Sequence, residues 1–160
     1  MAETIRLTNQ AATDPAVASD VADILATATI LAAYFSNQGR VYPTLAAGAT
    51  IISAATDWGL GAIAQIIPAA TVTSDYYLHS VNIETCDKNG IFELVLYQGA
   101  GDAEITRLRF AIAGGFFGNS FFTLNGPLVP ANARIRAQLA SSDGLANQAT
   151  ITISLCYHLA

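Results

Sequence analysis

The sequence predicts a mainly β fold, an antiparallel β-sandwich preceded by an N-terminal extended arm and a helix. First, 52% of the 160 residues are hydrophobic and 12% are charged, which excludes a disordered chain and suits one packed domain. Second, apolar residues recur at helical spacing near the N-terminus. Third, from about residue 48 they alternate with polar residues in short runs separated by turn signals, as in sandwiches and barrels. We therefore divide the chain into an arm and helix over 1–47 and a β-sandwich over 48–160.

The arm and the helix are predicted from the N-terminal region. Ile5 and Leu7 alternate with polar residues, which favours an extended arm over 1–12. Asp14 is a suitable N-cap, and Pro15 is a suitable first residue of a helix. Beyond them, apolar residues recur at spacings of three and four, as on one face of a helix: Val17, Val21, Ile24, Leu25, Ala28, Leu31 and Phe35.

The end of this helix is also marked in the sequence. Gly39 is a suitable stop, and Pro43 prevents the helix from resuming. The β-branched residues of the same stretch, Thr27 and Thr29 among them, favour strands instead. We adopt the helix because the apolar spacing continues over about five turns, and strands remain the alternative.

The second region shows the strand period. Its clearest strand is the last one, in which four apolar residues face one way: Ile151, Ile153, Leu155 and Tyr157. Segments 104–112 and 133–140 alternate in the same manner. In an earlier strand, Tyr77, Val81 and Ile83 are expected to share one face. The Asn-Gly pair at 89–90 follows as a strong hairpin signal, so the next strand should pair antiparallel with that one.

Charge and composition bound the class of partner. The net charge of −5 and the pI near 4.7 argue against a nucleic-acid-binding protein, which needs a basic patch. We expect no leader peptide, because the first residues lack a basic start followed by an apolar run. We expect no membrane helix either, because glycines and prolines interrupt the longest uncharged stretch, 110–133. A monomer with so few charges would be poorly soluble, so we expect a homo-oligomer. Two cysteines do not make a disulfide scaffold, so we expect the protein to be made in a reducing cytoplasm.

The sequence offers little that could carry catalysis, and we predict no enzyme and no cofactor. Gly59 and Gly61 have the outline of a dinucleotide-binding turn, but Pro68 would stop the required helix after one turn. We interpret this segment as a glycine-rich bend. Asp20 and Asp23, three residues apart, are interpreted as a solvated helix face rather than a catalytic pair.

Metal binding is not expected either. His79, Cys86, Cys156 and His158 are the residues with metal-ligand chemistry. Cys156 and His158 share a strand face, whereas His79 and Cys86 lie seven apart and point to opposite faces of a regular strand. Only a β-bulge could bring all four together. Whether Cys86 pairs with Cys156 is left open.

Interaction with a partner is the favoured use of several other residues. Two pairs of arginines, each pair on one strand face, suit either cross-strand ion pairs or a subunit contact. Four phenylalanines flank a charge-free turn and cannot all enter the core: Phe116, Phe117, Phe121 and Phe122. The predicted partner-binding residues are Ile5, Arg6, Leu7, Arg107, Arg109, Phe116, Phe117, Arg134 and Arg136.

Four segments carry a resemblance to a known group of proteins: IISAATDWGLGAIAQIIP at 51–68, LVLYQGAGDAEITRLRF at 94–110, LVPANARIRAQLA at 128–140 and TITISLCYH at 150–158. With them, residues 48–160 resemble the jelly-roll cement or decoration proteins of tailed-bacteriophage capsids. The resemblance implies a jelly-roll-like sandwich, a homotrimer and binding to the major capsid protein. It supplies no catalytic residue, and it does not extend to the arm and helix.

The predicted function is therefore that of a non-enzymatic virion structural protein on the capsid surface, assembled in the cytoplasm of the bacterial host. The alternative is a tail-fibre or receptor-binding β-sandwich that recognises a glycan or a host surface. Exposed Trp58, Tyr76 or Tyr77 beside Asp or Asn side chains would favour this alternative.

Overall fold

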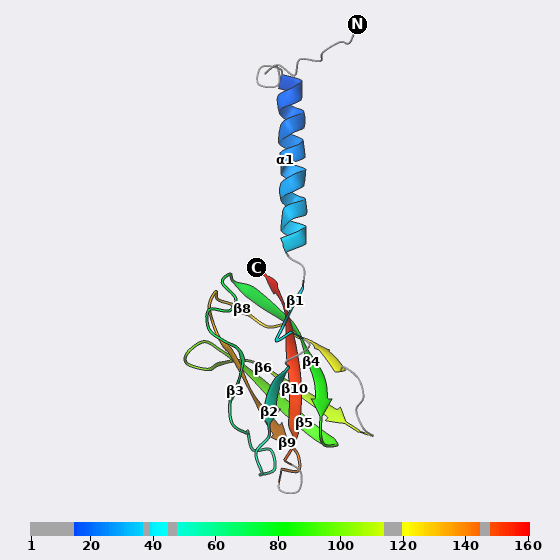
Figure 1. Ribbon diagram of the computed structural model, residues 1–160, viewed down its shortest axis with the longest axis vertical. Helices are drawn as coiled ribbons and strands as arrows, with labels where there is room; N and C mark the ends of the chain where they lie inside the picture. The colour runs from blue at the N-terminus through cyan, green and yellow to red at the C-terminus, as the bar shows by residue number, and fades with distance from the viewer. Residues whose placement is uncertain (1–14, 37–38, 45–47, 114–119, 145–147) are drawn as a thin grey trace. The chain divides into compact units, whose positions relative to one another are not determined.

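A computed structural model describes residues 15–36, 39–44, 48–113, 120–144 and 148–160 (Figure 1). The chain divides into two compact units, Met1–Gln38 and Gly39–Ala160. The described part of the first unit is helix α1, Pro15–Ser36. It begins at Pro15, as the N-cap pattern predicts, and the alternative of strands in this stretch is wrong.

The threonines that favour strands are accommodated within α1. The hydroxyl of Thr27 donates to the carbonyl oxygen of Asp23 at 2.8 Å, and that of Thr29 donates to Leu25 at 2.8 Å. Each hydroxyl therefore has a hydrogen-bond acceptor in the preceding turn of the helix. Judged over its described residues, α1 does not have the length and apolar character that crossing a membrane requires.

The second unit consists of two antiparallel sheets. The first sheet contains β1 (Arg40–Tyr42), β2 (Ala49–Ile52), β10 (Thr150–Leu159), β4 (Tyr76–Cys86), β7 (Ser120–Thr123) and β8 (Leu128–Val129). The second sheet contains, in spatial order, β3 (Ala64–Ile67), β9 (Ile135–Ser141), β5 (Gly90–Gln98) and β6 (Ala103–Ile112). The predicted hairpin connects β4 to β5, but these strands lie in different sheets, so the expectation that they pair with each other is wrong. Instead, β5 pairs with β6 and β9.

The strand pairing is that of a jelly roll. Strands β2 to β5 pair antiparallel with the later strands in reverse order: β2 with β10, β3 with β9, β4 with β7 and β8, and β5 with β6. The chain thus forms one long antiparallel ribbon, rolled so that β10 also pairs with β4 and β9 with β5. This arrangement confirms the predicted jelly-roll-like β-sandwich.

The core lies between the two sheets. The four alternating residues of the last strand are all buried, with Ile151, Ile153 and Leu155 fully so. They face side chains of the second sheet such as Phe92 and Leu139, within one continuous apolar cluster. Burying apolar side chains from both inner faces is the main stabilising contribution in a sandwich.

A β-bulge reverses one sequence expectation. Ser80 pairs with Cys156 and Leu78 with Tyr157, so His79 is an extra residue on β4. The bulge shifts the alternation by one position. Leu78 therefore faces the core with Val81, whereas Tyr77 is exposed, and the expectation that it shares their face is wrong.

The sandwich unit begins earlier than the sequence indicates. β1 pairs with β10 through residues 40–42, within the stretch that the sequence assigns to the arm and helix. A strand of three residues is too short to show a period of two, which explains why the sequence boundary falls at 47/48 and the structural one at 38/39.

Candidate interaction surfaces

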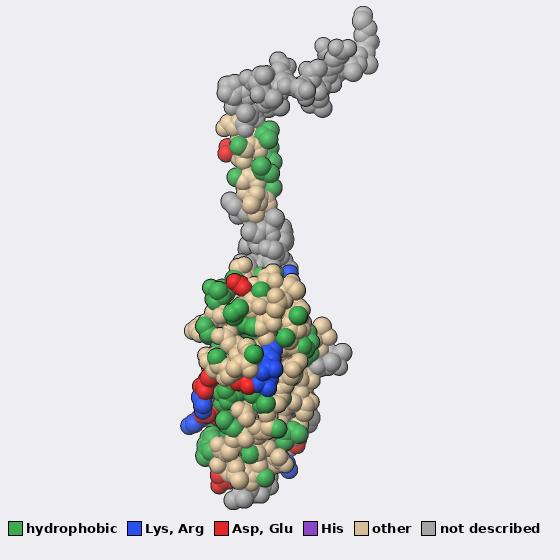
Figure 2. Space-filling view, turned by 90° about the vertical axis from the view of Figure 1, so that its left-hand side faces the viewer, with side chains coloured by type: hydrophobic (Ala, Val, Ile, Leu, Met, Phe, Trp, Pro, Cys, Tyr) green, Lys and Arg blue, Asp and Glu red, His purple; other side chains and the backbone are tan. Residues whose placement is uncertain are grey.

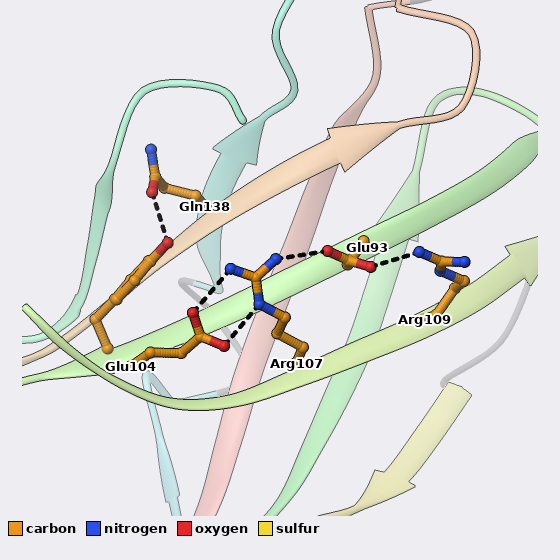
Figure 3. A network of polar contacts seen from close by, with 6 residues as sticks. Glu93, Glu104, Arg107, Arg109 and Gln138 are labelled. Atoms are coloured by element: carbon orange, nitrogen blue, oxygen red, sulfur yellow. Dashed lines mark hydrogen bonds and ion pairs between the residues drawn. The ribbon is translucent and has the colours of Figure 1, made fainter. Parts of the chain in front are cut away.

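The outer face of the second sheet carries a network of paired charges. Glu93 lies on β5 opposite Arg109 of β6, and its two carboxylate oxygens accept from Arg107 at 2.9 Å and from Arg109 at 2.8 Å. Arg107 also binds Glu104 through its Nε at 2.6 Å and its Nη2 at 2.8 Å (Figure 3). Of the two interpretations of this arginine pair, the structure thus gives the cross-strand ion pairs.

The network shifts the titration of its members. Hydrogen bonds, first from Arg109 and then from Arg107, hold the pKa of the Glu93 carboxyl below its ordinary value. The hydrogen bond from Arg107 lowers the pKa of Glu104 as well. Glu93 is hydrogen-bonded to both arginines. We therefore expect it to make the clearest contribution to the pH dependence of stability.

Replacing Glu93 with Gln should make stability less dependent on acid. A carboxylate whose pKa is lowered by folding stabilises the fold above its unfolded pKa of about 4.3, and this contribution is lost as the pH falls through the folded value. We expect wild-type stability to fall below about pH 5 and E93Q to lose less over that range, in urea unfolding measured at several pH values. At pH 7 the variant should be less stable by no more than about 2 kcal/mol, because each exposed ion pair contributes about 0.2–1 kcal/mol. Equal acid losses in the two proteins would contradict the assignment.

The second pair of arginines holds a turn. Arg134 donates to the carbonyl oxygens of Gly99 at 3.2 Å and Ala100 at 2.9 Å, in the turn between β5 and β6. Arg136 forms an ion pair with Asp102 of the same turn. The guanidinium groups of all four arginines are thus engaged within the chain, and their use by a partner remains a prediction. Figure 2 shows charged side chains of both signs gathered on one part of the sandwich, with hydrophobic and uncharged surface around them.

Trp58 is associated with this network. It is 43% exposed, and the guanidinium carbon of Arg109 lies 4.7 Å from its ring centroid. Such a cation–π contact fixes the position of an aromatic ring without burying it.

A groove on the outer face of the first sheet gathers aromatic and polar side chains. His158 of β10 lies in register with Tyr77 of β4, and their rings stack with centroids 5.5 Å apart. His79, which the bulge displaces, meets the ring of His158 edge-on at 6.1 Å. With Leu78, Leu124, Asn125 and Gly126, these residues line a groove of about 280 Å³.

The sequence singles out Tyr77, His79 and His158 one by one, but it does not predict that they meet. The pairing of β4 with β10, with Tyr77 opposite His158, is the signal that could have found them. Tyr76, in contrast, is fully buried, and burial raises its pKa to about 12. It therefore cannot serve as an exposed aromatic residue.

The cysteines and histidines are not brought together as a set of four. Cys86 pairs with Ile151, five residues along β10 from Cys156, a separation of about 17 Å at ~3.4 Å per residue. Both cysteines are free thiols, which answers the open question of their pairing. Within the described ranges, no group of three or more His, Cys, Asp and Glu side chains is placed to hold a metal ion.

The other predicted residues have mixed outcomes. Phe122 packs against the core, and Phe121 is 57% exposed, so the expectation that these phenylalanines divide between core and surface is confirmed for this pair. Ile5, Arg6, Leu7, Phe116 and Phe117 lie outside the described residues. The segment around Gly59 and Gly61 leads into strand β3 rather than into a helix, as expected of a bend.

Helix α1 presents the most exposed apolar side chains of the described chain. Ile24 and Leu25 are 68% and 67% exposed, and Val21 and Leu31 are 52% and 47% exposed. The core cluster includes no residue of α1. In proteins most of the stability of a helix comes from packing of its apolar face, so this face of α1 is a candidate contact surface.

Comparison with known proteins gives structural similarities of low identity. No protein-family model matches the sequence, and no curated protein matches it. A structure of infectious bursal disease virus Gt strain is similar to 78% of the chain, with 16% identity and a TM-score of 0.37. The VP2 subviral particle of the same virus is similar over 78% of the chain, with 14% identity and a TM-score of 0.35. The chain spans about a third of the length of these viral chains, 34% and 33% respectively.

Proposed function

We propose that this chain is a non-enzymatic virion structural protein, a capsid cement or decoration protein that forms a homo-oligomer and binds the major capsid protein. The observation that carries the proposal is the set of large hydrophobic side chains that remain exposed outside the core of the jelly roll. Besides the residues of α1, the exposed large hydrophobic side chains include Ile52, Trp58, Leu60, Ile63, Ile91, Phe121 and Leu128. Contiguous exposed apolar surface marks sites of contact with other chains, and these side chains are the candidates for such a contact.

The charged residues support an interaction role over a catalytic one. The arginines of the second sheet are paired with Glu93, Glu104 and Asp102, so their charges stabilise strands and turns. Cementing needs no bond chemistry. It needs a rigid module with apolar contact area, and the jelly roll provides both.

The energetic effect of such a protein follows from mass action. A protein that binds the assembled shell but not free coat subunits stabilises the shell by RT ln(1 + [L]/Kd) for each site. In this proposal, residues 1–12 lie extended across the coat lattice and add a strand to the edge of a sheet. The jelly roll remains folded on the outside of the particle.

Removal of the arm tests the proposal. Full-length protein added to particles that lack it should cosediment with them and appear as density on the capsid in electron-microscopy maps. A variant without residues 1–12 should lose binding by at least about tenfold while its sandwich keeps the same unfolding temperature, because the strands of the described sandwich begin at Arg40. Failure of the full-length chain to bind particles would overturn the capsid role. Equal binding by both proteins would overturn only the role of the arm.

The groove at Tyr77 favours a second candidate function, recognition of a glycan by a receptor-binding domain. Tyr77 is 38% exposed and stacked on His158, with Asn125 in the same groove. A concave site that combines an aromatic ring with a few polar groups is typical of small-ligand recognition. Binding of the isolated protein to a glycan array, in place of binding to particles, would favour this function over the capsid role.

A further inference from the structure

Helix α1 has an exposed apolar face. Its 22 residues include two charged ones, Asp20 and Asp23, and no lysine or arginine. Figure 2 shows hydrophobic side chains gathered along one side of the helix. The large apolar residues Val21, Ile24, Leu25 and Leu31 are between 47% and 68% exposed.

The spacing of the apolar residues indicates what kind of partner fits. Six positions follow one another at intervals of four, three, four, three and four residues: Val17, Val21, Ile24, Ala28, Leu31 and Phe35. Intervals of four and three residues alternate without a break, so each kind of position recurs every seven residues, as in a heptad pattern. A recurrence every seven residues keeps the apolar seam aligned with a second helix.

The residues that would receive such a partner lie together on one face of α1. A groove on the helix is lined by Ile24, Thr27, Ala28 and Leu31, with Asp23 beside it. The first four occupy positions i, i+3, i+4 and i+7. These are the relative positions of the four residues that form a hole in a coiled coil, into which one side chain of the facing helix inserts.

We propose that α1 forms a parallel, three-stranded coiled coil with the same helix of two further copies of this chain. An identical chain supplies the same heptad repeat in the same register and in equal number. The proposal rests on the proposed function only for the expectation of an oligomer. Cyclic symmetry makes the three helices parallel, because it carries the same end of each chain to the same end of the assembly.

The number of strands follows from Leu25. It lies next to the seam position Ile24 and is 67% exposed, so the apolar stripe is wider than the seam itself. In a two-stranded coil the flanking positions are largely open to water, and charged residues usually fill them. Here the two flanking positions beside the Ile24–Ala28 turn are Leu25 and Thr27, which suits a third helix that covers them.

Charges play a minor part in this association. Asp20 occupies the same flanking position as Thr27, seven residues earlier, and Asp23 lies farther from the seam. Without basic residues, copies of α1 cannot form ion pairs with one another. Association therefore depends on apolar burial, and the trimer should persist at 1 M NaCl, where the Debye length is only about 3 Å.

Two double variants of the full chain test the seam. In I24E/L31E, both substitutions place glutamate on the seam, whereas S19E/A26E places the same charges at the same spacing of seven on the exposed side away from it. In sedimentation equilibrium, the wild type and S19E/A26E should have the mass of a trimer, and I24E/L31E the mass of a monomer. Glutamate is a good helix former, so the two variants differ in position and not in propensity. A monomeric wild type, or a trimeric I24E/L31E, would overturn the proposal.

Cross-linking tests the orientation. In a background of C86S and C156S, V21C should form disulfide-linked dimers within the trimer on oxidation, because parallel helices place identical seam positions side by side. S19C should not do so. An absence of cross-linking by V21C would overturn the parallel arrangement. A trimer that forms but does not bind particles would overturn the capsid role and leave the coiled coil supported, so the two failures are distinguishable.

Discussion

Replacing Phe92 with Ala is expected to lower the free energy of unfolding by about 3–5 kcal/mol, the largest effect of any single substitution considered for this chain. Phe92 on β5 is fully buried, and its ring lies 5.6 Å from that of Phe110 on β6. Phe110 in turn lies 5.7 Å from Phe122 on β7, which belongs to the opposite sheet. The three rings thus join the two sheets, and removal of the first leaves a cavity between them.

The neighbouring residue provides the control. Ile91 lies on the same strand but points outward and is 46% exposed, so I91A should cost no more than about 1 kcal/mol. Urea unfolding followed by far-ultraviolet circular dichroism measures both changes. Similar losses in F92A and I91A would contradict the assignment of Phe92 to the core between the sheets.

The sheets were predictable where alternation is regular. The residues of β10 from Ile151 to Tyr157 alternate without a break, and each predicted core residue of that strand is buried. The same pattern could not place Tyr77, because the extra residue of the bulge at His79 changes the face of everything before it. A bulge depends on how the partner strand pairs, and a single segment does not contain that information.

The interaction surfaces were predictable in composition but not in arrangement. The pairing of Arg107 and Arg109 on one strand face is visible in the sequence. That Glu93 lies opposite them depends on the register between β5 and β6. The same holds for the groove, because Tyr77 and His158 are far apart in the sequence and meet only through strand pairing. Residue types follow from local patterns, whereas pairwise contacts follow from topology.

The second large effect is expected at Gly61, where the chain passes close to another backbone segment. A Cβ atom at this position would collide with the carbonyl oxygen of Ile52. The backbone is also fixed at both of its polar groups. The N–H of Gly61 donates to the carbonyl oxygen of Leu139 at 2.9 Å, and its own carbonyl oxygen accepts from the Gln138 side chain at 2.7 Å. Relief of the collision would break these hydrogen bonds.

We therefore expect G61A to be destabilised by about 3 kcal/mol, the upper end of the usual cost of overpacking. The matched control is G101A, since no atom lies within 4 Å of a Cβ added at Gly101. That substitution should leave stability unchanged or raise it by up to about 1 kcal/mol, because alanine restricts the unfolded chain. Both values follow from urea midpoints measured at one pH. Equal losses of stability in G61A and G101A would show that an added methyl group is destabilising at either position. The close approach of residues 52 and 61 would then not explain why glycine is needed at position 61.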